Sequence, residues 1–285
     1  MPLSRWFISL ALLVLASSPL GAQDELPEEL KKLGAKMVAD NAFKSSFSPD
    51  GKKLVVGRMP VGSGLSIIDL ADGKATEISK EGKDPAWQPK KGALIAYVLK
   101  NNTEEEIWLT NVAGEQARKL ADASFPCWSG DGGTLYCHSR MTKKLLAYDA
   151  SGGEPKLKEE FDIPFSYYPV VSPDGERVAF QVDEKLQIYD LKAKKLVRSW
   201  PVPGWMGLLP AWSPDSKQVA FGTYGHGDGA GFWLLDVPGA RVTEIAKGSC
   251  TMAAWSPDGK QLAFDLREAK RYRVLLIDAA KLPGK

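Results

Sequence analysis

The sequence predicts an all-β fold, a six-bladed β-propeller with four-stranded antiparallel blades. One five-residue pattern occurs six times, and successive copies start 40, 41, 43, 41 and 43 residues apart. A fixed period of roughly 40 to 50 residues indicates stacked β-sheet units rather than a mixed fold. The copies are Phe47-Ser48-Pro49-Asp50-Gly51, Trp87-Gln88-Pro89-Lys90-Lys91, Trp128-Ser129-Gly130-Asp131-Gly132, Val171-Ser172-Pro173-Asp174-Gly175, Trp212-Ser213-Pro214-Asp215-Ser216 and Trp255-Ser256-Pro257-Asp258-Gly259.

Each copy predicts a tight turn between the first two strands of a blade. Proline presets φ at about −65°, aspartate bonds the backbone ahead of it, and glycine takes the left-handed position. Apolar runs rich in strand-forming residues follow, and a third run ends each time in Asp or Asn, as in Ile67-Ile68-Asp69. A fourth, more polar run such as Lys194 to Trp200 suits the outer edge of a blade. The inner strands are apolar on both faces because each blade packs between two neighbours.

The sixth unit contains only three strand patterns, and the segment from Ala35 to Ala39 precedes the first unit. We expect this segment to supply the missing strand, because pairing the two ends of the chain removes exposed sheet edges. The alternative is an amphipathic helix from Glu28 to Asn41, since Leu30, Leu33 and Val38 fall near helical spacing. Both interpretations hold if the helix ends early.

Residues 1–22 have the layout of a secretory signal peptide. Arg5 is their only charge, an apolar run extends from Trp6 to Leu15, and small residues follow up to Ala22. The run is about half of the roughly 20 residues that a membrane-spanning helix needs, so we expect cleavage after Ala22 and a periplasmic or secreted protein. Residues 23–42 then form an N-terminal segment and residues 43–285 a single propeller domain, expected to be a monomer.

The charge balance gives no sign of a nucleic-acid partner. Without residues 1–22, Lys+Arg falls from 37 to 36 against 35 Asp+Glu, a net charge of +1. No second apolar stretch of membrane length occurs, so we expect no transmembrane segment after cleavage.

The unit Trp-Ser-Pro-Asp-Gly-Lys-x-Leu/Val-Ala-Phe is clearest at Ala254 to Phe264 and Ala211 to Phe221. It resembles the WD-repeat-like propeller repeat of TolB-type proteins, and the resemblance covers residues 43 to 279. The α/β domain that precedes the propeller in those proteins is expected to be absent, so its partnership with a peptidoglycan-associated lipoprotein is not carried over. The repeat also looks like the propeller of prolyl-oligopeptidase-type enzymes, but no Gly-x-Ser-x-Gly elbow occurs.

Four tryptophans, Trp87, Trp128, Trp212 and Trp255, recur at one repeat position, where large rings fill the space between blades. The alternative is that some of them line the axial channel and stack on a sugar or peptide. The hairpin aspartates are each explained by their own turn and lie in separate blades, so we do not expect them to act as catalytic acids.

The strongest binding candidates lie on the side of the ring that carries the loops between second and third strands and between successive blades, here named the loop face. Aromatic residues gather in these loops, and positive charges lie on the same side, which suggests recognition of a mildly anionic partner. The alternative is that these aromatics only pack beneath long loops. The candidate residues are Phe165, Tyr167, Tyr168, Trp200, Trp205, Tyr224, His226 and Arg271, accompanied by Phe161, Met206, Lys143, Lys144, Arg267, Lys270 and Arg273.

No cofactor, catalytic residue or metal is expected. The only histidines, His138 and His226, lie two blades apart, and Gly222 to Gly231 lacks the lysine of a phosphate loop. We therefore expect a non-catalytic binding or scaffolding protein of the cell envelope that recognises a protein, peptide or glycan. The alternative is a hydrolase or lyase using Asp228 and His226 at the channel mouth; a structural part of a larger envelope assembly is also consistent with the sequence.

The three cysteines, Cys127, Cys137 and Cys250, are expected to be free, buried thiols. Aligning the hairpins places Cys127 opposite Leu135, so that Cys127 and Cys137 are diagonal neighbours beyond easy disulfide reach.

Overall fold

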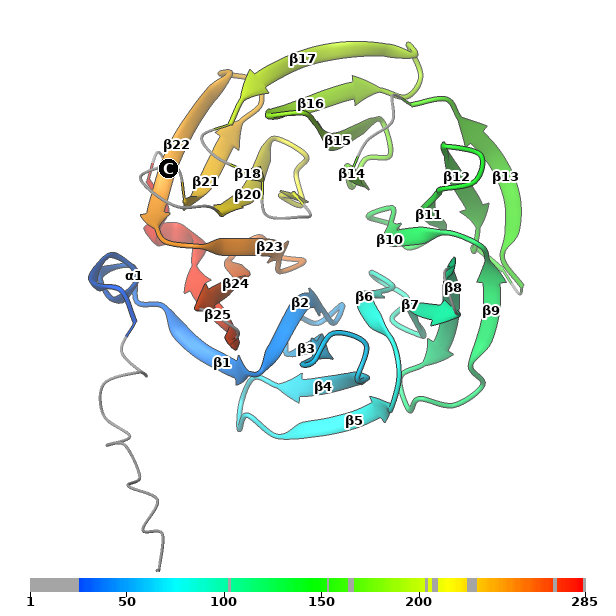
Figure 1. Cartoon of the computed structure of the whole chain (residues 1–285), viewed down its shortest axis with the longest axis horizontal. Coiled ribbons are helices and arrows are strands. Elements are labelled where there is room, and N and C mark those ends of the chain that lie inside the picture. The colour runs from blue at the N-terminus through cyan, green and yellow to red at the C-terminus, as the bar shows by residue number, and fades with distance from the viewer. Residues whose placement is uncertain are drawn as a thin grey trace, which may run out of the picture.

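In the computed structural model, the chain forms six antiparallel sheets arranged in a ring around a central axis, the six-bladed propeller that the repeat predicts (Figure 1). The structure describes residues 26–101, 104–152, 154–163, 167–202, 205–206, 210–224, 230–268 and 271–283. The predicted signal peptide lies outside these residues. Among the helices that are described, none has the length and apolar character needed to cross a membrane.

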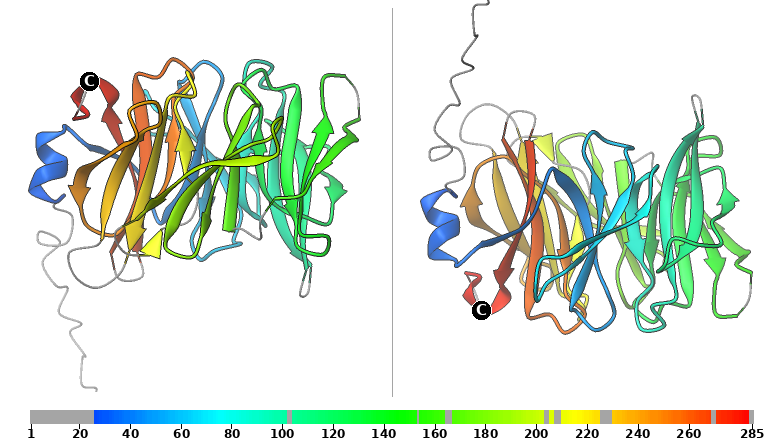
Figure 2. Two further views of the ribbon diagram at one scale, coloured as in Figure 1. Left: turned by 90° about the horizontal axis from the view of Figure 1, so that it is seen from above. Right: turned by 90° about the horizontal axis from the view of Figure 1, so that it is seen from below.

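The strands of each blade run through the thickness of the ring, and they follow one another from the axis to the rim (Figures 1 and 2). Blade 1 contains β2 (Ala42–Phe47), β3 (Lys53–Arg58), β4 (Leu65–Asp69) and β5 (Ala75–Ser79), and blade 2 contains β6 (Lys83–Trp87), β7 (Leu94–Asn101), β8 (Glu104–Asn111) and β9 (Arg118–Ala121). Blade 3 contains β10 (Ser124–Trp128), β11 (Thr134–Ser139), β12 (Lys144–Asp149) and β13 (Lys156–Phe161), and blade 4 contains β14 (Tyr167–Val171), β15 (Arg177–Val182), β16 (Lys185–Asp190) and β17 (Lys195–Pro201). In blade 5, β18 (Trp205–Met206) and β19 (Ala211–Trp212) both pair with β20 (Gln218–Tyr224), which is followed by β21 (Gly231–Asp236) and β22 (Arg241–Lys247).

The sixth blade joins the two ends of the chain. Its strands β23 (Cys250–Trp255), β24 (Gln261–Glu268) and β25 (Arg271–Asp278) are completed by β1 (Lys36–Asp40), which pairs antiparallel with β25. The closing strand that the sequence predicts is therefore confirmed.

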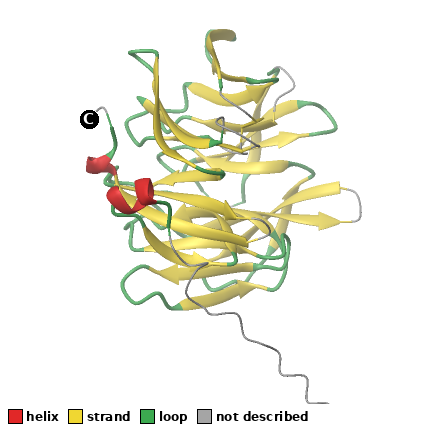
Figure 3. Ribbon diagram, turned by 60° about the vertical axis from the view of Figure 1, so that its left-hand side comes forward, coloured by secondary structure: helices red, strands yellow, loops and turns green. Residues whose placement is uncertain are grey.

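A short helix, α1 (Glu28–Lys32), precedes the closing strand and lies at the outside of the ring beside the 3-10 helix η1 (Ala279–Lys281) (Figure 3). The helix ends at Lys32 rather than at Asn41, because Gly34 takes a left-handed φ of +69° and ends the helical segment, so the short helix and the closing strand both occur. Leu30 of α1 is fully buried against blades 5 and 6, so the helix packs against the blade that the closing strand completes and against its neighbour, blade 5.

The repeated turn has the mechanism that its sequence predicts. In five blades the serine hydroxyl donates a hydrogen bond of 2.5 to 2.7 Å to the aspartate Oδ1, which also accepts a backbone N–H two residues further on. The same serine oxygen accepts the N–H that starts the second strand. The turn interpretation of these aspartates is confirmed, and we name the side of the ring that carries these turns the hairpin face.

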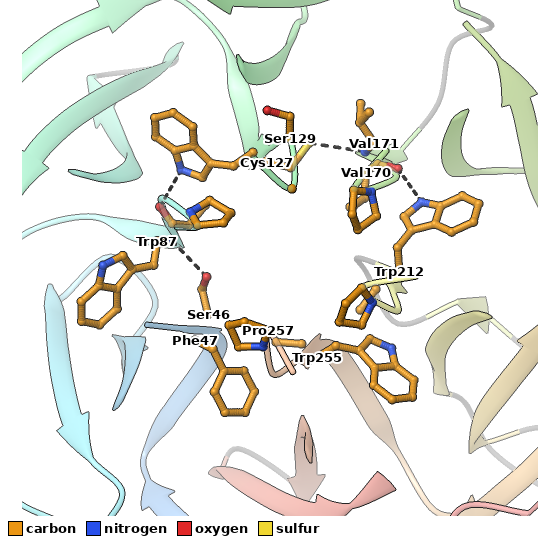
Figure 4. A pocket seen from close by; sticks show the side chains of 18 of the residues that line it. Ser46, Phe47, Trp87, Cys127, Ser129, Val170, Val171, Trp212, Trp255 and Pro257 are labelled. Atoms are coloured by element: carbon orange, nitrogen blue, oxygen red, sulfur yellow. Dashed lines mark hydrogen bonds between the residues drawn. The ribbon is translucent and has the colours of Figure 1, made fainter. Parts of the chain in front are cut away.

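The tryptophans of the repeat pack between blades. Trp87, Trp128, Trp212 and Trp255 are at most 9% exposed, and the rings that Figure 4 labels point away from the axis. Two of the indoles cross to the preceding blade, because Trp128 Nε1 donates to the Ala86 carbonyl and Trp212 Nε1 donates to the Val170 carbonyl, each at 3.0 Å. The packing interpretation holds for these tryptophans.

Candidate functional site: the loop-face mouth of the channel

One repeat position brings five side chains to the same level of the channel. The first strand of five blades has an irregular register, and the residue three before the conserved Phe, Trp or Val takes a left-handed φ of +31° to +57°. Such a bulge inserts an extra residue and re-aims the side chains beside it. The five residues are Lys44, Asp84, Phe125, Tyr168 and Met252.

Two of these five residues, Tyr168 and Met252, belong to a cluster in which apolar side chains from three blades meet toward the loop-face end of the channel. Phe43 and Met252 are buried at the centre of this cluster, 3% and 7% exposed. Met59, Tyr168, Val170 and Tyr272, all partly exposed, pack against them. We name these six residues the plug. Because they come from blades 1, 4 and 6, the plug connects opposite sides of the ring.

Aromatic rings and guanidinium groups surround the plug in pairs. The rings of Tyr168 and Phe125 meet edge to face with centroids 4.4 Å apart, and the Arg140 guanidinium lies 5.9 Å from the Phe125 centroid. Arg267 lies 5.9 Å from the centroid of Tyr224 and 5.8 Å from that of Tyr272. Both arginines are exposed. The mouth therefore presents cation–π pairs, each formed by an arginine guanidinium and an aromatic ring.

A buried carboxylate network supports the Arg140 side of the mouth. Glu105 accepts a hydrogen bond of 2.5 Å from Lys83 Nζ and another from the Ser124 hydroxyl, and Arg140 Nη2 lies 3.5 Å from its Oε2. Burial acts to raise the pKa of Glu105, but the bonds from Lys83 and Ser124 outweigh it and leave the pKa lowered. The carboxylate therefore stays ionised and holds Arg140 beside Phe125.

The Tyr168 hydroxyl is a neutral group at physiological pH. Burial is the main cause that raises its pKa to about 12, and the charges of Asp84 and Glu105 add to the shift. A neutral phenol can donate and accept hydrogen bonds, so Tyr168 presents to a partner both an apolar ring and a polar tip.

The predicted site residues do not all lie at the mouth. Tyr168 and Tyr224 lie at the mouth, on blades 4 and 5, as the sequence suggests. Tyr167 and Trp205 lie on β14 and β18, where their backbones pair with Gln181 and Tyr224. Phe165 and His226, with Asp228 and Lys270, lie outside the described residues.

Trp200 belongs to the core rather than to the site. Its side chain is 8% exposed and packs between blades 4 and 5 with Leu186, Ile188 and Val202. For this residue the packing alternative holds, because its position at the end of β17 turns the ring into the gap between blades rather than toward the loops.

Carboxylates pair with three of the six positively charged residues that the sequence places on this side. Arg271 Nε and Nη2 donate to Asp40 Oδ1 and Oδ2 at 2.7 and 2.8 Å, which ties β25 to the end of β1. Arg273 is 1% exposed and pairs with Glu268 at 2.6 Å, and Lys144 pairs with Glu160 at 3.0 Å. Arg271 thus serves ring closure, and the exposed cations at the mouth itself are Arg140 and Arg267.

The thiols and His138 are packing residues. Cys127, Cys137 and Cys250 are free, and burial raises the pKa of each, that of Cys127 to about 11. The predicted pairing is wrong by one residue: next to the turn, Trp128 faces Leu135 and Cys127 faces Tyr136. Burial lowers the pKa of His138, which is 1% exposed. Among the residues that are described, no group of three or more His, Cys, Asp or Glu side chains is arranged to hold a metal ion.

Comparison with solved structures supports the propeller type. TolB from Acinetobacter baumannii superposes with a TM-score of 0.61 at 19% identity over 73% of this chain, which spans 56% of that chain. TolB from Agrobacterium tumefaciens gives 0.61 at 20% identity over 82% of this chain and 89% of the other. The fold is a TolB-like propeller.

An enzyme shares the same architecture. Hydrazine synthase from Kuenenia stuttgartiensis gives a TM-score of 0.60 at 18% identity, over 84% of this chain and 77% of that chain. At such identities the likeness concerns the fold alone, because one fold hosts unrelated functions. No protein family model and no curated protein matches the sequence.

Proposed function

We propose that the chain is a non-catalytic, exported binding or scaffolding protein of the cell envelope. It captures a protein, peptide or glycan with the loop-face mouth of the propeller. The observation that carries this proposal is the mouth itself, where Tyr168, Tyr224 and Tyr272 share one surface with the exposed guanidinium groups of Arg140 and Arg267. Tyrosine and arginine are the side chains that most often dominate binding energy at protein interfaces.

The rigidity of the mouth supports a binding role. Tyr168 and Tyr272 pack on the plug, and Arg140 is held by the buried carboxylate of Glu105. Side chains fixed before the partner arrives lose less rotamer entropy when they bind, which favours affinity. The plug belongs to three blades at once, so a partner resting on it contacts several blades together.

The chemistry of the described titratable groups also favours binding over turnover. The hairpin aspartates are bonded within their turns, and the thiols of Cys137 and Cys250 are buried with raised pKa values. Nucleophilic or acid catalysis needs groups with pKa values matched to the task and open to substrate. The proposed location, periplasmic or secreted, rests on the signal-peptide pattern of residues 1–22.

The test compares capture by two variants of the mature chain immobilised as bait for envelope extract. Replacing Tyr224 and Arg267 by alanine changes the mouth without touching the buried plug positions, and Lys192→Ala alters an exposed lysine elsewhere as a matched control. We expect the double variant to lose the captured partner and the control to retain it. Equal capture by all three proteins places the binding surface elsewhere, and turnover of a sugar or peptide substrate that is lost in His226→Ala favours the hydrolase or lyase alternative.

A further inference from the structure

The guanidinium group of Arg267 lies over two tyrosine rings at the loop-face mouth. Its central carbon is 5.9 Å from the ring centroid of Tyr224 and 5.8 Å from that of Tyr272. The side chain is exposed, and within the described part of the chain no carboxylate pairs with it. The other two arginines of the β24–β25 hairpin, Arg271 and Arg273, each pair with a carboxylate. The charge of Arg267 is therefore left for a partner.

The surroundings of Arg267 hold it in place and leave its donors available. No described residue accepts a hydrogen bond from its guanidinium nitrogens, and its backbone N–H donates to the Ser249 carbonyl at 2.8 Å. Tyr272 belongs to the plug, where its ring centroid lies 6.3 Å from that of Phe43, and Tyr224 lies on β20 of blade 5. A guanidinium group can bind a carboxylate through two parallel hydrogen bonds, and a group positioned in advance loses less entropy on binding.

A second exposed guanidinium group lies across the mouth. Arg140 comes from blade 3 and Arg267 from blade 6, and these blades are opposite each other in the ring (Figure 1). Arg140 lies 3.5 Å from Glu105, a carboxylate that Lys83 already binds at 2.5 Å. Lys143 is exposed in the same loop as Arg140, and it pairs with no carboxylate of the described residues. These cations thus outnumber the carboxylates that pair with them.

Exposed apolar side chains accompany these cations. Met141 is 76% exposed in the loop that carries Arg140, and Val61 is 56% exposed in the loop between β3 and β4 on the same face. Methionine, arginine and tyrosine are enriched at the interfaces between proteins. A sugar stacks on open ring faces, whereas Arg267 covers one face of each of its two tyrosines. The surface therefore favours a protein segment over a glycan.

We propose that the loop-face mouth recognises an acidic segment of a partner protein, with one carboxylate of that segment bonded to Arg267 and further acidic side chains near Arg140 and Lys143. This inference rests on the proposed function and deepens it, because it names the chemistry of the partner and the residue that selects it. Bidentate bonds between arginine and carboxylate are strong and geometrically specific. Apolar side chains of the segment contact the plug and Met141.

Binding of such a segment should depend on salt. Charges at an exposed surface are screened over about 10 Å at 0.1 M salt and over about 3 Å at 1 M. Complementary charges at the edge of an interface act mainly by speeding association. We therefore expect the affinity to fall several-fold between low salt and about 1 M sodium chloride, chiefly through slower association.

The first test selects random peptides displayed on phage, with the immobilised mature protein as the target. We expect the selected peptides to be enriched in aspartate and glutamate, and this enrichment to disappear when Arg267→Met is the target. Arg198→Met is the matched control, because Arg198 is also exposed and lies 5.9 Å from the ring centroid of Trp200, but on the outer strand β17. The control should select the same acidic peptides as the unmodified protein.

The second test measures the affinity of one selected peptide by calorimetry in two synthetic forms. One form keeps its acidic residues, and the other has glutamine and asparagine in their places. We expect the amide form to bind about tenfold or more weakly, because hydrogen bonds to a charged group are lost. Arg267→Met should weaken binding of the acidic form by a similar factor, and Arg267→Lys, which keeps the charge without the planar fork, should retain part of the affinity.

Three outcomes would overturn the inference. The first is that no peptide is selected, or that the selected peptides are not enriched in acidic residues. The second is that the acid and amide forms bind the unmodified protein equally, a comparison that needs no variant. The third is that oligogalacturonate, an acidic glycan, binds in a manner that depends on Arg267 while the acidic peptide does not.

The same peptides separate this inference from the proposed function. Peptides that need Tyr224 and Arg267 but not their own acidic groups would refute the acidic partner and leave the mouth as the binding surface. Peptides that bind the Tyr224→Ala, Arg267→Ala double variant as well as the unmodified protein would contradict both.

Discussion

The indole of Trp212 donates a hydrogen bond of 3.0 Å to the carbonyl oxygen of Val170, and so joins blade 5 to blade 4. Trp128 makes the equivalent bond to Ala86 across the boundary between blades 3 and 2. In each case the acceptor immediately precedes the residue that holds the tryptophan position in the preceding blade. The repeated sequence therefore supplies both the indole donor and the carbonyl acceptor of a hydrogen bond between neighbouring blades.

Removing this bond should weaken the boundary between blades. Trp212→Phe keeps most of the apolar area but leaves the Val170 carbonyl without its partner, so we expect a loss of about 1 to 3 kcal/mol in the free energy of unfolding. Trp212→Ala also leaves a cavity and should cost roughly 3 to 5 kcal/mol. Guanidinium chloride denaturation followed by circular dichroism measures both values. A Trp212→Phe protein as stable as the unmodified one would contradict this account of the contact.

The serine–aspartate turns predict a stability that depends on pH. The bond from the serine hydroxyl is the largest cause that lowers the pKa values of Asp50, Asp131 and Asp258. A carboxyl group whose pKa is lower in the folded state stabilises the fold above its unfolded pKa of about 3.9, and this contribution is lost as the pH falls through the folded value.

A triple variant tests this directly. Ser48→Ala, Ser129→Ala and Ser256→Ala together remove the three donors, so the unmodified protein should exceed the variant in stability by more at pH 7 than at pH 3. Each substitution should cost about 1 kcal/mol at pH 7. Urea denaturation at the two pH values gives the comparison, and a difference that stays constant between them would refute the assignment.

Ring closure should depend on the β1 backbone more than on its ion pair. Asp40 and Arg271 are each about one-third exposed, so Asp40→Asn should cost at most about 1 kcal/mol. Deleting residues 26–40 removes the whole pairing of β1 with β25 and the burial of Leu30, and should lower the melting temperature far more. Calorimetry of both variants checks this order, which would be disproved if the truncated chain melted like the intact one.

The thiols should be inert in the folded protein. Cys137 and Cys250 are fully buried with raised pKa values, so we expect iodoacetamide to modify them only after unfolding, and the mass of the protein to be the same with and without a reductant. Rapid labelling of either residue under native conditions would show that the blades containing them open readily.

The architecture could be predicted from the sequence because similar local signals recur at six regular positions, and five of the six blades keep the serine–aspartate turn. The turn at Ser256-Pro257-Asp258-Gly259 is fixed by chemistry within a few residues, and so is the strand that follows it. The closing strand could also be inferred, since an unpaired sheet edge at the sixth blade requires a partner.

Errors arose where contacts between distant residues decide the structure. The residue that faces Trp128 across the turn is Leu135, so Cys127 faces Tyr136, and the bulge in β10 between Ser124 and Cys127 is a further irregularity that the alternation of side chains does not reveal. Trp200 looked like a loop residue, but its ring enters the gap between blades 4 and 5.

The centre of the site was largely missed for the same reason. Phe43 and Tyr272 are far apart in the chain and meet only when the ring closes. Aligning the copies three positions before the tryptophan could have shown Lys44, Phe125, Tyr168 and Met252 as one ring, because the bulge recurs in every one of those blades.

The central claim, that the loop-face mouth is the binding surface, is tested most directly by hydrogen–deuterium exchange of the protein with and without its captured partner. The account predicts slower exchange around Phe125, Arg140, Tyr168, Tyr224 and Tyr272, and unchanged exchange on the outer strands β13 and β17. Protection confined to those outer strands or to the hairpin turns, with none around Tyr168 and Tyr272, would contradict it.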